Sequence, residues 1–180
     1  MKKSIKFNSG NIISIRKKID EEIKSSWLTI RHENIMSKKA IKAGLGSGKD
    51  LKALYNRITQ LAEKRIKIKG MLCYLNNGET TFNFEEFKKT NNYHIFAAGE
   101  AKEAIAQLHM IKTINPALKA EKGLKGLGNK ETFTAQKIAA LIKDLQLIAN
   151  KHDAELEKFN KETSLDISDY SDDFKEYIAA

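Results

Sequence analysis

Residues 51–75, LKALYNRITQLAEKRIKIKGMLCYL, decide the fold of this chain, because apolar residues recur in them at alternating steps of three and four. This spacing places one continuous stripe on a face of an α-helix, and its seven-residue period is typical of helices packed as in a coiled coil. The stripe positions are Leu51, Leu54, Ile58, Leu61, Arg65, Ile68, Leu72 and Leu75. Such a helix needs a long partner, so the segment predicts one arm of an antiparallel helical hairpin.

The stripe contains one charged residue, Arg65. An arginine in an apolar helical seam needs a carboxylate partner, and a polar group there fixes the register of the paired helices at a cost in stability. We therefore expect Arg65 to have a structural function in preference to a ligand-binding one.

The preceding residues predict the partner helix, over about residues 11–42, with Ser9 or Asn11 as its N-cap. Its length would be about 48 Å. Its apolar residues stand at three- and four-residue steps or multiples of them: Ile12, Ile15, Ile19, Ile23, Trp27, Ile30 and Ile41. The loop AGLGSGKD, residues 43–50, separates the two helices, and Asp50 is expected to cap the second.

The end of the second helix has two interpretations. The heptad pattern predicts helix to about residue 75. However, Ile66 and Ile68 alternate with lysines, and Asn77-Gly78 is typical of a hairpin turn, so a small β-hairpin over residues 66–84 is the alternative.

The second half of the chain predicts another pair of long helices. Asn83, followed by Glu86, indicates a short capped helix ending near residue 89. A long helix follows over about residues 93–114, stopped by Pro116, and another begins after Thr132 or Thr134. The stripe of the last helix is Ile138, Leu141, Leu145, Ile148, His152, Leu156 and Phe159.

These elements predict an all-α fold of two tandem long helical hairpins, four helices with coiled-coil-like packing. The expected divisions are a basic N-terminal hairpin at 1–78, a second hairpin at 79–163 and an acidic tail at 164–180. The net charge is +9 overall, but it is +11 over residues 1–80 and −5 over residues 131–180. This asymmetry favours docking of the tail on the basic half, within the chain or on a neighbour.

The best-ordered charges recur every seven residues on the first predicted helix: Lys17, Lys24, Arg31 and Lys38. Such a line is usually a solvated flank whose alkyl stems cover the hydrophobic seam. The alternatives are an anionic protein surface and nucleic acid. Only four of the 32 basic residues are arginine, the residue that holds phosphates bidentately, which weakens the nucleic-acid interpretation.

Two Gly/Lys loops precede predicted helix N-termini, where free amides favour anions. Lys49 lies in the first loop, and Lys122, Lys125 and Lys130 lie in the second. The first loop is not a nucleotide-binding P-loop, because Ala43 replaces its first glycine and Asp50 follows the lysine in place of Ser or Thr. Chain reversal by the glycines is the usual use of such loops, and a small-anion site is the alternative.

No pattern of catalytic, metal or cofactor chemistry is present, so we expect no enzyme and no cofactor. The four histidines have no metal-ligand spacing, and the single cysteine, Cys73, fits a reducing compartment. The start of the chain has no apolar run of signal-peptide length and no segment suits a membrane span, so we expect a cytoplasmic protein without a membrane partner.

The composition is typical of phage and mobile-element accessory proteins. We therefore expect a non-enzymatic interaction or assembly protein that binds a protein partner or itself through helical faces. The alternatives are a basic nucleic-acid-binding accessory protein and a binder of small, nucleotide-like anions at the Gly/Lys loops.

Overall fold

The computed structural model describes residues 6–36, 40–113 and 132–164, and within these ranges every regular element is helical. The elements are α1 (Ser9–Glu33), a π-helical turn η1 (Ile41–Leu45), α3 (Leu51–Asn76), α4 (Phe84–Phe87), α5 (Asn91–His109) and α6 (Ala135–Glu162). The predicted all-α class is therefore confirmed, whereas the alternative β-hairpin over residues 66–84 is wrong, because α3 continues to Asn76 and no strand follows it within that range.

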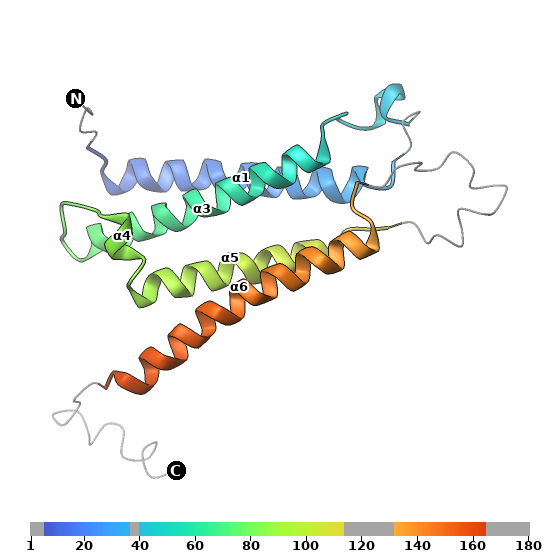
Figure 1. Cartoon of the computed structure of the whole chain (residues 1–180). Helices are drawn as coiled ribbons and strands as arrows, with labels where there is room; N and C mark the ends of the chain where they lie inside the picture. Colours follow the sequence, from blue (N-terminus) through green and yellow to red (C-terminus); the bar gives the residue numbers. More distant parts are fainter. Residues whose placement is uncertain (1–5, 37–39, 114–131, 165–180) are drawn as a thin grey trace, which may run out of the picture.

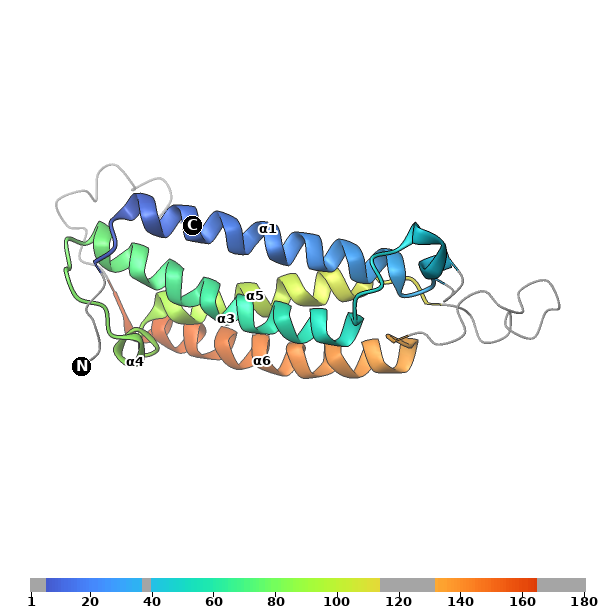
Figure 2. The same ribbon diagram turned by 90° about the horizontal axis from the view of Figure 1, so that it is seen from above.

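The four long helices lie side by side, with α3 and α5 between α1 and α6 in both views (Figures 1 and 2). The most extensive packing is of α1 on α3 and of α5 on α6, and α3 joins the two pairs through α5. In Figure 1, α6 runs obliquely to α5, so its C-terminal half lies farther from α3 than its N-terminal half does.

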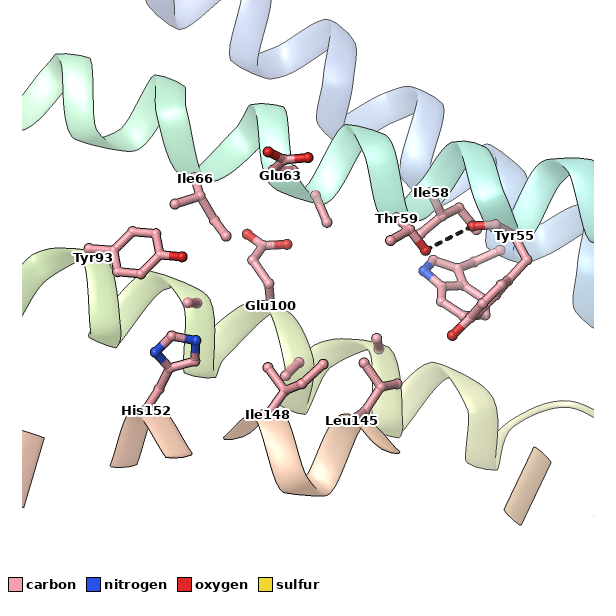
Figure 3. A pocket seen from close by; sticks show the side chains of 15 residues that line it. Tyr55, Ile58, Thr59, Glu63, Ile66, Tyr93, Glu100, Leu145, Ile148 and His152 are labelled. Atoms are coloured by element: carbon pink, nitrogen blue, oxygen red, sulfur yellow. Dashed lines mark hydrogen bonds between the residues drawn. The ribbon is translucent and has the colours of Figure 1, made fainter. Parts of the chain in front are cut away.

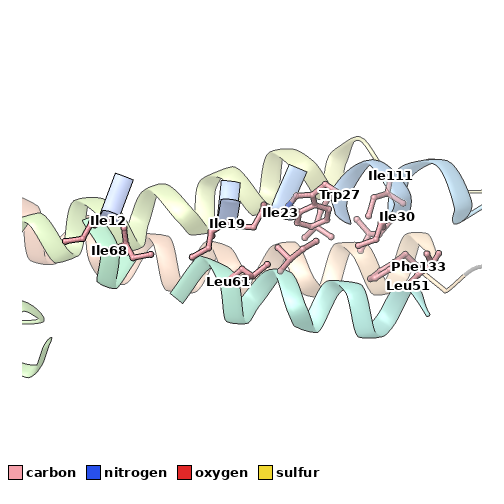
Figure 4. Packing of buried hydrophobic residues seen from close by; sticks show 13 residues of the cluster. Ile12, Ile19, Ile23, Trp27, Ile30, Leu51, Leu61, Ile68, Ile111 and Phe133 are labelled. Carbon is pink, nitrogen blue, oxygen red and sulfur yellow. The ribbon is translucent and has the colours of Figure 1, made fainter. Parts of the chain in front are cut away.

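The main core fills the space between these helices and is closed at one end by aromatic rings. Trp27, Tyr55 and Phe133 pack edge to face, with ring centroids 5.9 Å and 5.7 Å apart. Most of the stripe residues predicted for α1 and α3 belong to this cluster or pack against it (Figure 4). Ile15 is an exception, since it is exposed on α1.

α1 is shorter at its C-terminal end than predicted, ending at Glu33 and not near residue 42. Asn34 explains the ending, because its buried side chain bonds to residues far along the chain. Its amide accepts from Phe133 N at 2.8 Å, donates to Phe133 O at 2.8 Å and donates to Lys112 O at 3.0 Å. The N-cap also differs from prediction: it is Asn8, whose side chain accepts from Asn11 N at 2.8 Å.

A second cluster lies under α4 and depends on one glycine. Phe87 is fully buried, and a Cβ added to Gly70 of α3 would lie 2.6 Å from its ring. Gly70 therefore lets α4 approach α3 closely. Asn83 caps α4, as predicted, accepting from Glu85 N and Glu86 N.

The second pair of helices differs from prediction in its boundaries and in which residues of α6 are buried. α5 begins at Asn91, two residues early, with Thr90 as its N-cap, and it ends at His109. Thr134, one of the two predicted caps, is the N-cap of α6, which begins at Ala135. The predicted α6 stripe is wrong in part: Ala149 is fully buried, whereas Ile148 and Phe159 are 47% and 43% exposed. The predicted stop at Pro116 lies outside the described residues, and so do residues 165–180 of the predicted acidic tail, whose docking on the basic half stays a prediction.

Candidate binding surfaces

Arg65 joins three helices through a buried set of ion pairs. Its Nε lies 2.8 Å from Oε1 of Glu100 on α5, its Nη1 lies 3.1 Å from Asp20 on α1, and its Nη2 lies 2.7 Å from Glu103. Lys69 adds a further cation 3.0 Å from Glu100. Burial lowers the pKa of Arg65, but the hydrogen bonds and charges of Glu100, Asp20 and Glu103 together outweigh burial and raise it. The predicted carboxylate partner is thus confirmed.

A mainly apolar groove of about 290 Å³ opens between α3, α5 and α6 (Figure 3). The side chains from α3 and α6 point toward one another across it, including Ile66, Leu145 and Ile148. Two carboxylates, Glu63 and Glu100, line this groove, and no lysine or arginine of the described ranges does. We refer to it below as the apolar groove.

Several apolar side chains of α6 remain exposed to solvent in this structure. Ile148 and Phe159, which are about three turns apart and so lie on one face of α6, are each nearly half exposed. Leu147 is 62% exposed, on the opposite face of α6 from Leu145 and Ala149, and Ile95 of α5 is about half exposed. Single exposed apolar residues are ordinary on protein surfaces, but several on one amphipathic helix beside an apolar groove indicate a contact surface.

Two histidines meet at one end of the apolar groove. Nδ1 of His94 on α5 lies 2.9 Å from Nδ1 of His152 on α6, and the ring of Tyr93 packs edge-on against both. One nitrogen must donate and the other accept, so the pair in this geometry cannot carry a proton on both Nδ1 atoms. Burial, and then the neighbouring charge of His94, lower the pKa of His152.

Sequence spacing missed this pair, since 58 positions separate the two histidines. The one available signal was the place of His152 on the predicted stripe of the last helix. No cluster of three or more His, Cys, Asp or Glu side chains suited to a metal ion occurs in the described residues. The pair is therefore a contact between helices in this structure.

A second, charged hollow of about 370 Å³ lies between α1 and α5, and we call it the α1/α5 hollow. Asp20, Ile23, Lys24, Trp27 and Arg31 of α1, Arg65 of α3, and Glu103 and Gln107 of α5 line it. Trp27 and the side chain of Arg31 mark its inner wall, and Arg31 also borders a neighbouring hollow that contains Met110 and Lys112.

The four predicted anion-binding residues that the structure describes, Lys17, Lys24, Arg31 and Lys49, do not form one surface. Lys17 and Lys24 are exposed on α1, whereas Arg31 is half-buried and its Nη1 lies 2.9 Å from Sδ of Met110. Lys49 is exposed before α3, where the Asp50 carboxylate already accepts from Lys52 N and Ala53 N. Among them, Lys24 and Arg31 alone line the α1/α5 hollow. The other four predicted residues lie outside the described residues: Lys38, Lys122, Lys125 and Lys130.

Comparison with known proteins yields no relative. No protein-family model, curated protein or solved structure matches the chain significantly. Within the described ranges, no helix is both long and apolar enough to cross a bilayer.

Proposed function

We propose that this chain is a non-enzymatic helical interaction protein that binds a helix of another protein chain, or of a second copy of itself, in the apolar groove. The observation that carries the proposal is the exposed apolar surface of α6 beside that groove, above all Ile148, which lines it while 47% exposed. The proposal treats residues 1–78 and 79–163 as two helical hairpins and assigns partner binding to the seam between them.

Helix-in-groove recognition supports this choice. A partner helix presents apolar residues at steps of three and four, and these enter a hydrophobic groove between helices of the receptor. Fully burying an exposed isoleucine contributes about 2 kcal/mol, so a few such contacts would sustain a specific complex. Most residues of the C-terminal half of α6, which runs obliquely to α5 in Figure 1, are exposed and so accessible for such a contact.

The charges at the groove indicate the sign of the charge expected on the partner helix. Glu63 and Glu100 line it, and no described lysine or arginine does. Glu100 is already paired with Arg65 and Lys69. The available negative charge therefore comes from Glu63, which pairs at the surface with Lys67, and from Asp144 of α6. The pKa of Tyr55 is raised mainly by burial and then by Asp144. A helix with an apolar face and flanking basic residues fits this surface better than an acidic one, since complementary charge steers association.

The lysine-rich, cysteine-poor composition extends the proposal to the accessory proteins of phages and mobile genetic elements. The basic stripe of α1 supports binding of nucleic acid less well than the groove supports binding of a protein helix. Arg31, its one arginine, is half-buried beside Met110 and is not free on the surface.

Light scattering of the purified chain identifies the kind of partner. Ile148→Asp places a charge in the groove at an exposed position, and Ile13→Asp makes the same change at a 44% exposed residue of α1 that does not line the groove. A dimer that Ile148→Asp dissociates and Ile13→Asp preserves identifies a second copy as the partner. A dimer that neither change affects contradicts the assignment of self-association to the groove. A monomer identifies a different chain as the partner, which crosslinking from α6 then captures.

A further inference from the structure

The α1/α5 hollow contains two buried polar atoms without a partner. Nε of Arg31 and Oε1 of Gln107 are both inaccessible to solvent and form no hydrogen bond with any described residue. Leaving a buried donor or acceptor unpaired costs free energy, so such atoms need an explanation. One is a donor on α1 and the other an acceptor on α5, and both belong to the lining of the same hollow.

Two of the positively charged side chains in the hollow have no carboxylate partner among the described residues. Its two carboxylates, Asp20 and Glu103, are both engaged by Arg65. The guanidinium of Arg31 contacts only the thioether of Met110, which is a weak and uncharged acceptor. Lys24 is exposed and has no ion pair or hydrogen bond within the described part of the chain. Two positive charges of α1 therefore remain for a ligand.

We infer that the α1/α5 hollow binds a small organic anion that carries a phosphate or carboxylate group and a hydroxyl group. Binding turns the guanidinium of Arg31 from Met110 toward the hollow, where it donates to the anionic oxygens, because charge-assisted hydrogen bonds to a guanidinium are the stronger kind. Lys24 attracts the same oxygens. The amide of Gln107, whose Oε1 is closed to solvent in this structure, rotates to accept from the hydroxyl group. Trp27, whose indole lines the hollow, packs against the carbon skeleton.

This site is independent of the proposed protein partner. Its residues are not those of the Gly/Lys loops, and of its lining only Trp27 is shared with the apolar groove. Ile148→Asp is therefore expected to leave anion binding unchanged, so failure of one proposal does not imply failure of the other.

Calorimetric titration with four probes tests the assignment: inorganic phosphate, glycerol 3-phosphate, glycerate and uncharged glycerol. The two organic anions are expected to bind more tightly than inorganic phosphate, and glycerol is expected not to bind. Comparing glycerol 3-phosphate with glycerate distinguishes the phosphate from the carboxylate. Trp27 is the single tryptophan of the chain and lines both the hollow and the apolar groove, so a change in its fluorescence that Arg31→Gln abolishes and Ile148→Asp preserves assigns binding to the hollow.

Two variants and a control complete the experiment. Arg31→Gln is expected to weaken binding of both organic anions at least about tenfold, or about 1.4 kcal/mol. Gln107→Leu is expected to weaken the organic anions more than inorganic phosphate, because inorganic phosphate has no carbon skeleton that places a hydroxyl group at the acceptor. Lys17→Gln removes a positive charge from the same helix outside the hollow and is expected to change affinity little.

The inference is overturned if none of the anions binds at concentrations up to about 10 mM, well above a millimolar Kd. It is equally overturned if Arg31→Gln and Lys17→Gln bind the organic anions alike. A circular-dichroism spectrum of Arg31→Gln checks that α1 is intact. If it is not, Gln107→Leu provides the decisive comparison.

Discussion

Nε of Arg65 on α3 lies 2.8 Å from Oε1 of Glu100 on α5, and the side chains of both residues are at most 10% exposed. Because Asp20 of α1 accepts from the same guanidinium, this pair fixes the relative positions of three helices. A one-turn slip of any of them would leave a buried charge without its partner, which makes the alternative register costly.

Arg65→Met is expected to lower the free energy of unfolding by about 3 kcal/mol, because it removes the main partner of the buried Glu100 and leaves Lys69 to compensate that charge. Urea denaturation followed by circular dichroism measures the change. Arg57→Met is the matched control, since Arg57 of the same helix pairs with Glu22 at the surface. It is expected to have little effect, and equal losses for the two variants would contradict the structural function of Arg65.

Gly70→Ala is expected to destabilise the protein by about 1 kcal/mol or more, although alanine favours helix. Its methyl group would lie 2.6 Å from the ring of Phe87, which has no space to move, and such overpacking costs more than the helical preference returns. Gly99→Ala on α5 is the control, because no atom lies within 4 Å of its added methyl group. Thermal unfolding should show opposite signs, with Gly99→Ala stabilising by about 0.5–1 kcal/mol.

Acidification is expected to destabilise the α5–α6 contact. The pKa of His152 is lowered from its ordinary value of 6.5, mainly by burial and then by His94. As the pH falls, His152 is therefore protonated in the unfolded chain before it is protonated in the folded one. The stability that the neutral His152 contributes is fully present above about pH 6.5 and is lost as the pH falls toward the lower pKa of the folded state.

Urea denaturation at pH 7.5 and at pH 5.5 measures the loss. Replacing both His94 and His152 by glutamine should reduce the difference between the two pH values, whereas His109→Gln, at an exposed position of α5, should not. A pH dependence that is identical in both variants would exclude the pair as its source.

Asn34→Ala is expected to cost at least about 2 kcal/mol, because the variant leaves the buried amide of Phe133 and its carbonyl without their partner. Asn56→Ala, at an exposed position of α3, is the control and should fall within about 0.5 kcal/mol of the parent chain. The midpoint of urea denaturation gives both values. Similar midpoints would show that Asn34 does not hold the end of α1 in place.

Local patterns predicted the elements whose boundaries local chemistry decides. The seven-residue period of α3, the Asp50 and Asn83 caps and the need of Arg65 for a carboxylate could all be derived from neighbouring residues. The end of α1 could not, since the bonds of Asn34 go to residues 78 and 99 positions away.

The candidate sites were less predictable for the same reason. Heptad spacing placed Lys17, Lys24 and Arg31 on one line, but the packing of α5 decides that Arg31 is half-buried and that it borders a hollow. Helical periodicity likewise placed Ile148 on the buried stripe of α6, whereas the contact with α5 selects Ala149 one position later. A smaller residue at 149 lets the two helices approach closely, and Ile148 is left at the groove.

Site-specific photocrosslinking from Thr59, an exposed residue of α3 that lines the apolar groove, tests the central claim most directly. With a photoreactive amino acid at position 59 in cells, we predict one discrete protein adduct. Ile148→Asp should reduce that adduct at least about tenfold, as expected from losing about 1.4 kcal/mol or more of contact energy, while Ile13→Asp should preserve it. The absence of any discrete adduct, or an adduct equally abundant in both variants, would contradict a partner helix bound at the apolar groove.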